Sequence, residues 1–443
     1  MLNFRRMKHL YSIGLTIMMA CAFPASTMAQ MQYYIASSFG SRFNDINDSG
    51  MAVSGGGYFN FPTLTWSTIE SGATETASIN DSGDVAGSMY YDEPNYILQP
   101  AVRLNGTWTP IGWFPGADPA QSSFTTYSIS PNGEWVTGQM SNGCCDFGTF
   151  LYNTTTGTLS SIFSTDYVAV AGYVVTNNGT IGGWADDQAM GSTHRIPVYI
   201  TPDSTIVQVS PTPPLTGVNA VNDINASSQM VGDIDSHPFL YDLTSNTFTT
   251  FTIPPTYESA TFTSISNTGV AVGYAQKFGD FGDLLRETII YHPDLGPQPL
   301  LLKDILLANG VDINAPSGRM GTAIAISPDG QYIAGWDDQA PFAANGWVVY
   351  LDDLLFEGTT TAVREREQPS ISVSPNPATD MVRIASPKEI ASITLFNMDG
   401  QVVKQQTIGG TVGMVDISAL TSGIYTLRAT TPDASYVTRV VKQ

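Results

Sequence analysis

The sequence contains few of the residues that carry nucleophilic or metal chemistry. It has three cysteines and four histidines in 443 residues. Cys21 lies in an N-terminal apolar run, and the neighbours Cys144 and Cys145 can close only a small strained ring, which excludes a disulfide scaffold within one chain. No two histidines have the spacing of a zinc pair, and neither a Gly-x-Ser-x-Gly motif nor a glycine-rich phosphate loop occurs. The sequence therefore predicts no catalytic centre of these classes.

Basic residues are scarce in most of the chain. Residues 30–369 hold 34 Asp and Glu against 9 Lys and Arg, net −25, whereas residues 370–443 hold 5 against 6, net +1. Such a step indicates a domain boundary near residue 370. The acidic part would repel phosphate, which argues against nucleic acid and anionic membrane surfaces as partners.

Long apolar runs are absent beyond the N-terminus. Arg5, Arg6 and Lys8 precede an apolar stretch over 10–23, and small residues lead to a predicted signal cleavage between Ala29 and Gln30. A lipoprotein site at Cys21 is an alternative, although the residues before it match poorly. No later stretch is long enough to cross a bilayer. We therefore expect an exported protein without a transmembrane span in the mature chain.

One phrase recurs seven times: Ile or Val, a polar residue, and a tight turn. The copies occupy residues 46–50, 79–83, 129–133, 175–179, 224–228, 265–269 and 326–330. Six copies end in Gly and one in Ser228, and their mean separation of about 47 residues is the size of a four-stranded propeller blade. Gly suits the turn because it tolerates a positive φ.

Short β-branched and aromatic runs follow each turn, which predicts an all-β array. Radial closure is favoured because it buries both faces of every sheet and leaves only short edges. We predict a seven-bladed β-propeller-like domain over residues 30–352, with one helix near residues 300–307 before Asn309-Gly310.

A change of composition predicts a linker over 353–369 and a second domain over 370–443. The linker contains a Thr run and the charged stretch 364–367. New strand signals follow, and Asp399-Gly400 between two of them is typical of a hairpin. We expect a small Ig-like β-sandwich there.

The repeats resemble the extracellular HAF repeat family, whose units have an Ile-Asn-x-x-Gly turn and later a His-Ala-Phe-Leu strand. His237-Pro238-Phe239-Leu240-Tyr241 comes nearest to that strand, and the stretch 302–307 is similar to the family's segment before its last turn. The resemblance covers roughly residues 40 to 352 and implies an exported repeated β fold, without implying any chemistry.

The C-terminus resembles the type IX secretion sorting domain. The matching residues include Pro375, Asn376, Pro377, Asp399, Gly400, Gly423 and Tyr425, in the order and spacing of that family, with a final Lys442. The resemblance implies the type IX secretion machinery as a partner and delivery through the Gram-negative outer membrane. The product would be secreted or attached to the cell surface.

The loop after each repeated hairpin is acidic in six of the seven units, and two of these loops nearly repeat. The acidic residues are Asp92, Glu93, Asp146, Asp186, Asp187, Asp233, Asp235, Asp280, Asp283, Asp337 and Asp338. Equivalent propeller loops emerge on one face, so we expect a shared acidic rim with exposed Trp184 and Trp336 beside Asp186, Asp187, Asp337 and Asp338. This set is typical of a sugar-binding site or a Ca²⁺ site, and a solvated rim that only maintains solubility is the simpler interpretation.

Three functions remain open from the sequence. The first is a non-enzymatic surface or secreted protein that binds a glycan or a protein. The alternative is a propeller glycan hydrolase or lyase that uses paired carboxylates, and the third is a passive coat component. No cofactor is predicted, with Ca²⁺ left as a testable option.

Overall fold

The computed structural model describes residues 31–443 except 37–41, 71, 93–95, 144–146, 188–193, 211–218, 280–282, 314–318, 341–342, 352–371, 398–401 and 432–434. The signal cleavage site, Cys144-Cys145, the linker and Asp399-Gly400 lie outside the described residues. Residues Gln30–Thr359 form one compact unit and Thr360–Gln443 belong to another. Since the predicted domain limits fall among residues that are not described, they stay predictions.

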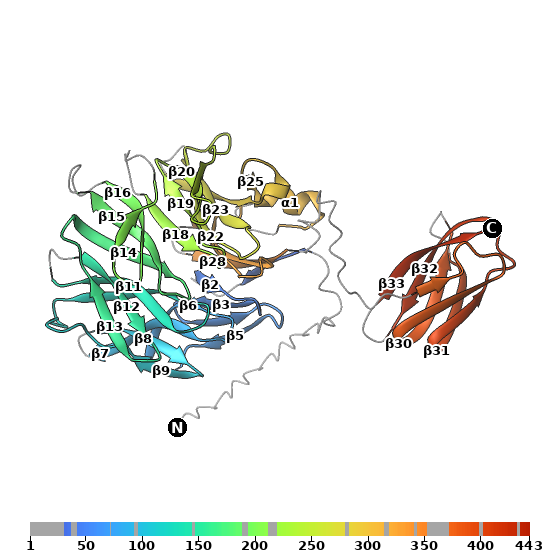
Figure 1. The fold of residues 1–443 in the computed structure, drawn as a ribbon, viewed down its shortest axis with the longest axis horizontal. Helices are drawn as coiled ribbons and strands as arrows, with labels where there is room; N and C mark the ends of the chain where they lie inside the picture. Colours follow the sequence, from blue (N-terminus) through green and yellow to red (C-terminus); the bar gives the residue numbers. More distant parts are fainter. Residues whose placement is uncertain are drawn as a thin grey trace, which may run out of the picture. The chain divides into compact units, whose positions relative to one another are not determined.

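The described residues of the larger unit form seven four-stranded antiparallel blades, which confirms the predicted propeller-like architecture (Figure 1). Blades 3 and 4 are joined into one sheet by a single parallel pairing of Phe147 with Ala169. Blades 1 to 3 are β2 (Phe43–Ile46), β3 (Met51–Ser54), β4 (Gly57–Asn60) and β5 (Thr65–Thr68); β6 (Ala73–Ile79), β7 (Val85–Asp92), β8 (Ile97–Leu104) and β9 (Thr107–Pro110); and β10 (Ser123–Ile129), β11 (Trp135–Ser141), β12 (Phe147–Asn153) and β13 (Thr158–Ile162). Blades 4 to 6 are β14 (Tyr167–Val175), β15 (Ile181–Asp187), β16 (Arg195–Ile200) and β17 (Ile206–Gln208); β18 (Ala220–Ile224), β19 (Gln229–Ile234), β20 (His237–Asp242) and β21 (Thr247–Thr250); and β22 (Ser259–Ile265), β23 (Ala271–Phe278), β24 (Leu284–Tyr291) and β25 (Leu300–Leu301).

Blade 7 joins the two ends of the propeller. It contains β26 (Thr322–Ile326), β27 (Tyr332–Ala340) and β28 (Ala343–Tyr350), and its outer strand is β1 (Gln32–Ala36). Gln32 pairs with Tyr350 and Ala36 with Gly346, while β2 of blade 1 packs against β26 and β27. The ring is therefore closed, as radial burial requires.

The repeated phrase forms the same turn in every blade. Its second residue accepts a hydrogen bond from a backbone N–H later in the turn, at 2.9 to 3.1 Å. The acceptors are Asn47, Asn80, Ser130, Thr176, Asn225, Ser266 and Ser327. Neighbouring turns also bond to each other: Asp329 N donates to Asp48 Oδ1 at 2.7 Å, which connects blade 7 to blade 1. These side-chain oxygens accept from backbone N–H groups of the turn that have no carbonyl partner within it.

Apolar side chains fill the spaces between blades. Val175 and Ile181 of blade 4, for example, share a cluster with Val221 and Met230 of blade 5. The predicted helix is present as α1 (Leu302–Ala308), after a short 3-10 turn η1 (Pro293–Leu295). Its buried Leu302 and Leu306 contribute to the core between blades 6 and 7, so its apolar stripe serves packing.

The C-terminal unit is a five-stranded antiparallel sheet with the order β29-β30-β32-β33 and β31 paired to β30. The strands are β29 (Ser372–Ser374), β30 (Met381–Phe396), β31 (Val402–Asp416), β32 (Gly423–Thr430) and β33 (Ser435–Lys442). The sheet encloses its own apolar core, as a sandwich-like fold does. Asn376 Oδ1 accepts from Val441 N at 2.8 Å, and Tyr425 Oη donates to Thr421 O at 2.8 Å. In the part of the chain that the structure describes, no helix combines the length and apolar character needed to span a membrane.

Candidate functional site

A β-bulge interrupts the innermost strand of every blade at the same place, two residues before the repeated Ile or Val. The bulged residues are Asn44, Ala77, Tyr127, Tyr173, Asn222, Thr263 and Ile324. In a regular strand, consecutive side chains point to opposite faces, but a bulge re-aims one of them. Both the bulged residue and the next one therefore line the centre of the propeller.

The second glycine of the repeat makes the bulge sterically feasible. Gly87, Gly138, Gly183, Gly232, Gly273 and Gly335 pair with the residue just before the bulge in blades 2 to 7. A Cβ at Gly232 would overlap the carbonyl oxygen of Ala220, and a Cβ at Gly183 would overlap that of Ala171. The glycines of the repeat are thus indirectly responsible for the shape of the central site.

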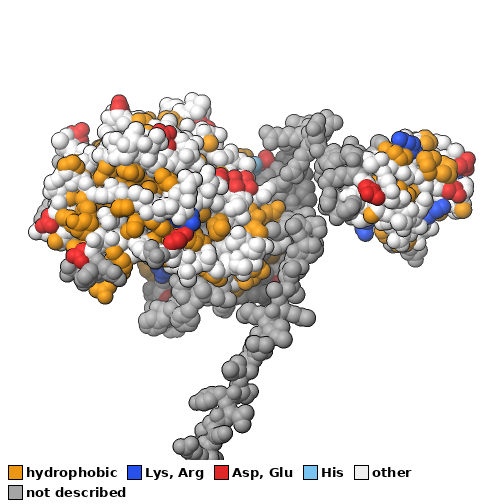
Figure 2. Space-filling view, turned by 90° about the horizontal axis from the view of Figure 1, so that it is seen from below, with side chains coloured by type: hydrophobic (Ala, Val, Ile, Leu, Met, Phe, Trp, Pro, Cys, Tyr) orange, Lys and Arg blue, Asp and Glu red, His pale blue; other side chains and the backbone are white. Residues whose placement is uncertain are grey.

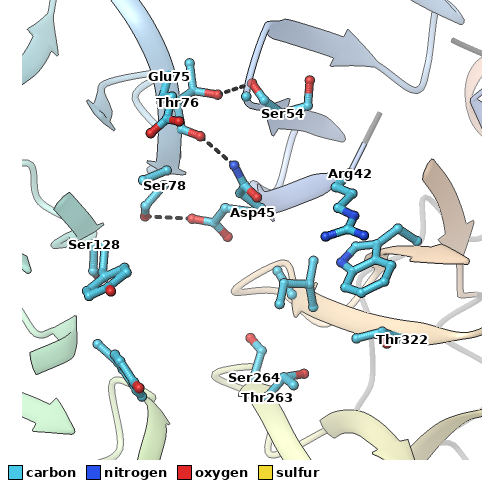
Figure 3. Close-up of a pocket in the computed structure, with 18 of the residues that line it drawn as sticks. Arg42, Asp45, Ser54, Glu75, Thr76, Ser78, Ser128, Thr263, Ser264 and Thr322 are labelled. Carbon is cyan, nitrogen blue, oxygen red and sulfur yellow. Dashed lines mark hydrogen bonds between the residues drawn. The ribbon is translucent and has the colours of Figure 1, made fainter. Parts of the chain in front are cut away.

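The site itself is a cavity of about 1290 Å³ on the axis of the propeller, to which all seven innermost strands contribute. Its lining is rich in hydroxyl groups, among them Ser78, Ser128, Thr263, Ser264 and Thr322. Figure 3 shows Asp45 and Arg42 with these side chains around an open centre. The cavity therefore offers many hydrogen-bonding groups from every direction.

Two carboxylates line the cavity in matching positions on blades 1 and 5. Asp45 Oδ2 accepts from Ser78 Oγ at 2.7 Å and from Ile79 N at 2.9 Å, both on blade 2. Asp223 Oδ2 accepts from Ser264 Oγ at 2.7 Å and from Ile265 N at 2.8 Å, both on blade 6. Burial raises the pKa of Asp45 to about 6 and also raises that of Asp223, against the opposing effect of these donors. Both groups connect neighbouring blades.

Aromatic side chains lie on several sides of the cavity. Tyr127 and Tyr173, both bulged residues, form an edge-to-face pair with centroids 5.4 Å apart. Trp66, Tyr274 and Trp336 line other parts of the wall. Aromatic rings combined with hydroxyl and amide groups can contact both the apolar faces and the polar edges of a ligand.

A third cavity carboxylate has a pKa near neutrality. Asp233 on β19 accepts from Thr261 Oγ1 at 2.9 Å. Burial raises the pKa of Asp233 to about 7, and the hydrogen bonds from Thr261 and Asn222 oppose that rise. At neutral pH this group therefore exchanges readily between its acid and carboxylate forms.

The sequence-predicted site residues do not form one exposed set. Trp184 is 4% exposed and Asp186 is 7% exposed. The guanidinium of Arg195 covers the Trp184 ring, with its Cζ 3.8 Å from the ring centroid. Asp337 is 4% exposed on β27. The side chains of Asp187 and Asp338 lie outside the described residues. The expected exposure of Trp184 is therefore wrong, because strands and not a loop carry these residues.

Trp336 differs from Trp184, since it lines the central cavity. Asp233 also lines the cavity, so the expectation of a single outer acidic rim does not hold for it. On the face shown in Figure 2, acidic side chains of the larger unit form small separate groups. Whether the predicted residues bind a ligand stays a prediction.

Sequence reasoning missed the bulged residues and those that follow them. The missed signal was the pair of residues immediately before each repeated Ile or Val, such as Asn44-Asp45 and Asn222-Asp223. The bulged residue and the residue after it differ from blade to blade, whereas the turn that follows them repeats. Among the described residues, no cluster of three or more His, Cys, Asp or Glu is arranged to hold a metal.

Comparison with solved structures gives similarities at low sequence identity. One is PorZ, described as an essential bacterial surface component of the type IX secretion system of Porphyromonas gingivalis. The sequence identity is 16%, the similarity covers 90% of this chain and 51% of that chain, and the TM-score is 0.31. Another is the extracellular domain of a protein from B. thetaiotaomicron assigned as a hybrid two-component system. The sequence identity is 10%, the similarity covers 93% of this chain and 59% of that chain, and the TM-score is 0.47. The chain thus spans between half and three fifths of the length of these two. No curated protein matches the sequence.

The C-terminal unit has a family match. Residues 372–443 match the secretion system C-terminal sorting domain. Pro375, Asn376, Pro377, Gly423 and Tyr425 of the predicted sorting motif fall within the matched residues. The protein therefore carries a type IX secretion signal and is delivered across the outer membrane to the cell surface or the exterior.

Proposed function

We propose that this protein is a non-enzymatic binding protein whose propeller cavity holds a glycan outside the cell. The observation that carries the proposal is the lining of the central cavity, which combines aromatic rings with hydroxyl and amide groups. A sugar presents apolar C–H faces to aromatic rings and hydroxyl edges to hydrogen-bonding groups. The similarity of the turns to HAF repeats supports an exported repeat protein and says nothing of the ligand.

The size of the cavity favours an oligosaccharide over a single sugar. Its volume of about 1290 Å³ exceeds the upper end, about 1,000 Å³, of sites for drug-sized molecules. A folded protein partner would not enter it, although a short peptide would. We therefore rank a glycan first and a protein ligand second.

Filling the cavity tests the proposal. A glycan array with the mature full-length chain identifies ligands, and calorimetry then compares Ala77→Trp with Ala120→Trp. Ala77 is a cavity-lining bulged residue, whereas Ala120 is exposed outside the cavity. We expect Ala77→Trp to abolish glycan binding and Ala120→Trp to leave it unchanged, with both variants folded. Glycan binding that survives Ala77→Trp would contradict the cavity as the site.

The hydrolase or lyase alternative keeps one supporting observation. Asp233 faces the cavity with a pKa of about 7, and a general acid works best when its pKa lies near the working pH. A panel of glycan substrates with the wild type and Asp233→Asn separates the two functions. Turnover that Asp233→Asn removes would support the enzyme, and binding without turnover supports our proposal.

A further inference from the structure

Three side chains from three blades form a cationic corner in the cavity wall. They are Arg42, just before β2 in blade 1, Trp336 on β27 in blade 7, and Arg286 on β24 in blade 6. The Cζ atoms of Arg42 and Arg286 lie 4.4 Å and 5.7 Å from the Trp336 ring centroid. Residues 30–369 hold only nine Lys and Arg, so two in one cavity wall are a concentrated positive charge.

The ring contacts orient both guanidinium groups. Arg286 also lies over Tyr274, with its Cζ 4.8 Å from that ring centroid, and its Nε donates to Gln276 Oε1 at 3.3 Å. Stacking uses the flat face of a guanidinium, while its N–H donors lie in the plane at the edges. The aromatic contacts thus hold both guanidinium groups in place at the cavity wall.

The acidic groups of the cavity lie mostly on other blades. Glu75 is on blade 2, and Asp223 and Asp233 are on blade 5. Asp45 belongs to blade 1, but its carboxylate is bonded toward Ser78 and Ile79 of blade 2. The neighbours Glu287 and Asp337 are each 4% exposed and do not line the cavity. Arg42 and Arg286 therefore concentrate positive charge at the Trp336 ring. The carboxyl groups are spread over blades 1, 2 and 5. Burial raises the pKa of Tyr274, and Asp233 lies close enough to that ring to raise it further.

We propose that the cationic corner binds a sugar carboxylate, so that the ligand of the cavity is an oligosaccharide containing uronic acid. This inference rests on the proposed glycan-binding function and makes it more specific. A guanidinium presents paired N–H donors that match the two oxygens of a carboxylate. The remaining sugar hydroxyls would face the Ser, Thr and Asn side chains of the other blades.

Carboxyl reduction provides a matched ligand pair for the test. Galacturonate, glucuronate and mannuronate tetrasaccharides are each compared with their carboxyl-reduced counterparts by calorimetry with the mature full-length chain. We expect at least one acidic member to bind about tenfold more tightly than its reduced partner, as loss of a hydrogen bond to a charged group implies. Salt should weaken the acidic ligand more than the reduced one.

Arginine variants test whether the cationic corner causes the preference for the acidic ligand. Arg42→Gln and Arg286→Gln should each weaken the acidic ligand about tenfold and leave the reduced ligand unchanged, which also shows that the variants are folded. Arg195→Gln is the matched control, because Arg195 stacks on Trp184 but does not line the cavity. Its affinity for both ligands should equal that of the wild type.

The outcomes separate this inference from the proposed function. Equal binding of acidic and reduced ligands, or binding of neutral glycans alone, would overturn the inference and leave glycan binding intact. An acidic preference that Arg42→Gln and Arg286→Gln do not alter would also overturn it. Absence of all glycan binding would remove both proposals together.

Discussion

The turns of the propeller and the walls of its cavity are adjacent in sequence yet differ in how strictly they repeat. The residue after the repeated Ile or Val is Asn, Ser or Thr in all seven blades, and in each it accepts the same backbone hydrogen bond. The bulged residue three positions earlier is Asn, Ala, Tyr, Tyr, Asn, Thr and Ile in successive blades. The repeated positions therefore form the scaffold, and the positions that vary form the wall of the cavity.

The physical reason lies in what each position must satisfy. If the second residue of the turn had no side-chain acceptor, a backbone N–H of the turn would lose its hydrogen-bond partner, and the free energy of unfolding would fall. A bulged side chain lines an open cavity, where side chains of different size fit. Some of them, such as Asn44 and Asn222, also donate a hydrogen bond to the next blade. The same seven-fold frame can therefore carry an asymmetric site.

The largest expected effect comes from removing the space that the bulge needs. Gly232→Ala should lower the free energy of unfolding by roughly 1–3 kcal/mol, the usual cost of forced overpacking, because its Cβ would meet the carbonyl of Ala220. Urea unfolding followed by fluorescence measures the change. Gly56→Ala is the control, since no atom lies within 4 Å of a Cβ there, and equal losses for both variants would contradict the role of the bulge.

A crossed pair of asparagines compares the two regions directly. Asn225 accepts from Ser227 N and Gln229 N and donates to Ser266 O, so Asn225→Ala should cost about 1–3 kcal/mol of stability. Asn222 is a half-buried bulged residue that lines the cavity and donates to Phe262 O at 2.8 Å. Asn222→Ala should therefore also lower stability but, unlike Asn225→Ala, should lower the affinity for the glycan as well. Melting and calorimetry on both variants measure the two effects. Equal changes in Tm and in glycan affinity for the two variants would contradict the distinction between the turn scaffold and the cavity wall.

One expected effect depends on pH and comes from Asp233. The pKa of Asp233 rises from 3.8 to about 7 through burial, so the folded chain binds this proton more tightly than the unfolded chain does. Ionisation of Asp233 therefore opposes folding, with no cost below about pH 4 and the full cost above about pH 7. Asp233→Asn should raise Tm on the order of 2–4 °C near pH 8 and leave it unchanged near pH 4.

A carboxylate with the opposite shift is the control for this effect. Hydrogen bonding from Ser245 lowers the pKa of the half-buried Asp242, so Asp242→Asn should not raise Tm at any pH. Calorimetric scans over the pH range measure both variants. A gain from Asp233→Asn that is equal at acidic and alkaline pH would exclude the ionisation of Asp233 as its cause.

Turn chemistry made the fold predictable from sequence. The positive φ at Gly50, Gly83, Gly133 and Gly179 is what the repeated glycines indicated, and strand runs of even spacing followed from composition. The bulge was not predictable, because it breaks the two-residue alternation that identifies a strand face. Tyr127 and Tyr173 therefore gave no sequence sign that both lie in the cavity wall.

The two acidic Trp repeats show why the burial of Trp184 was not predicted. Two similar sequences, around Trp184 and Trp336, were expected to behave alike. Arg195 lies over one indole and covers it, whereas the other lines the cavity with Arg42 beside it. Arg195 and Arg42 are outside the repeated segments, so the repeat alone could not distinguish the two tryptophans.

The outer strand of blade 7 has a consequence for how the chain becomes functional during export. In the described part of the chain, β1 (Gln32–Ala36) pairs with β28 (Ala343–Tyr350). Since β28 is synthesised long after β1, this strand lacks its hydrogen-bonding neighbour until blade 7 has been translated. Its backbone edge is unpaired during that interval, as the edge of an incomplete sheet is. Closure of the propeller therefore requires both ends of the chain segment that forms it.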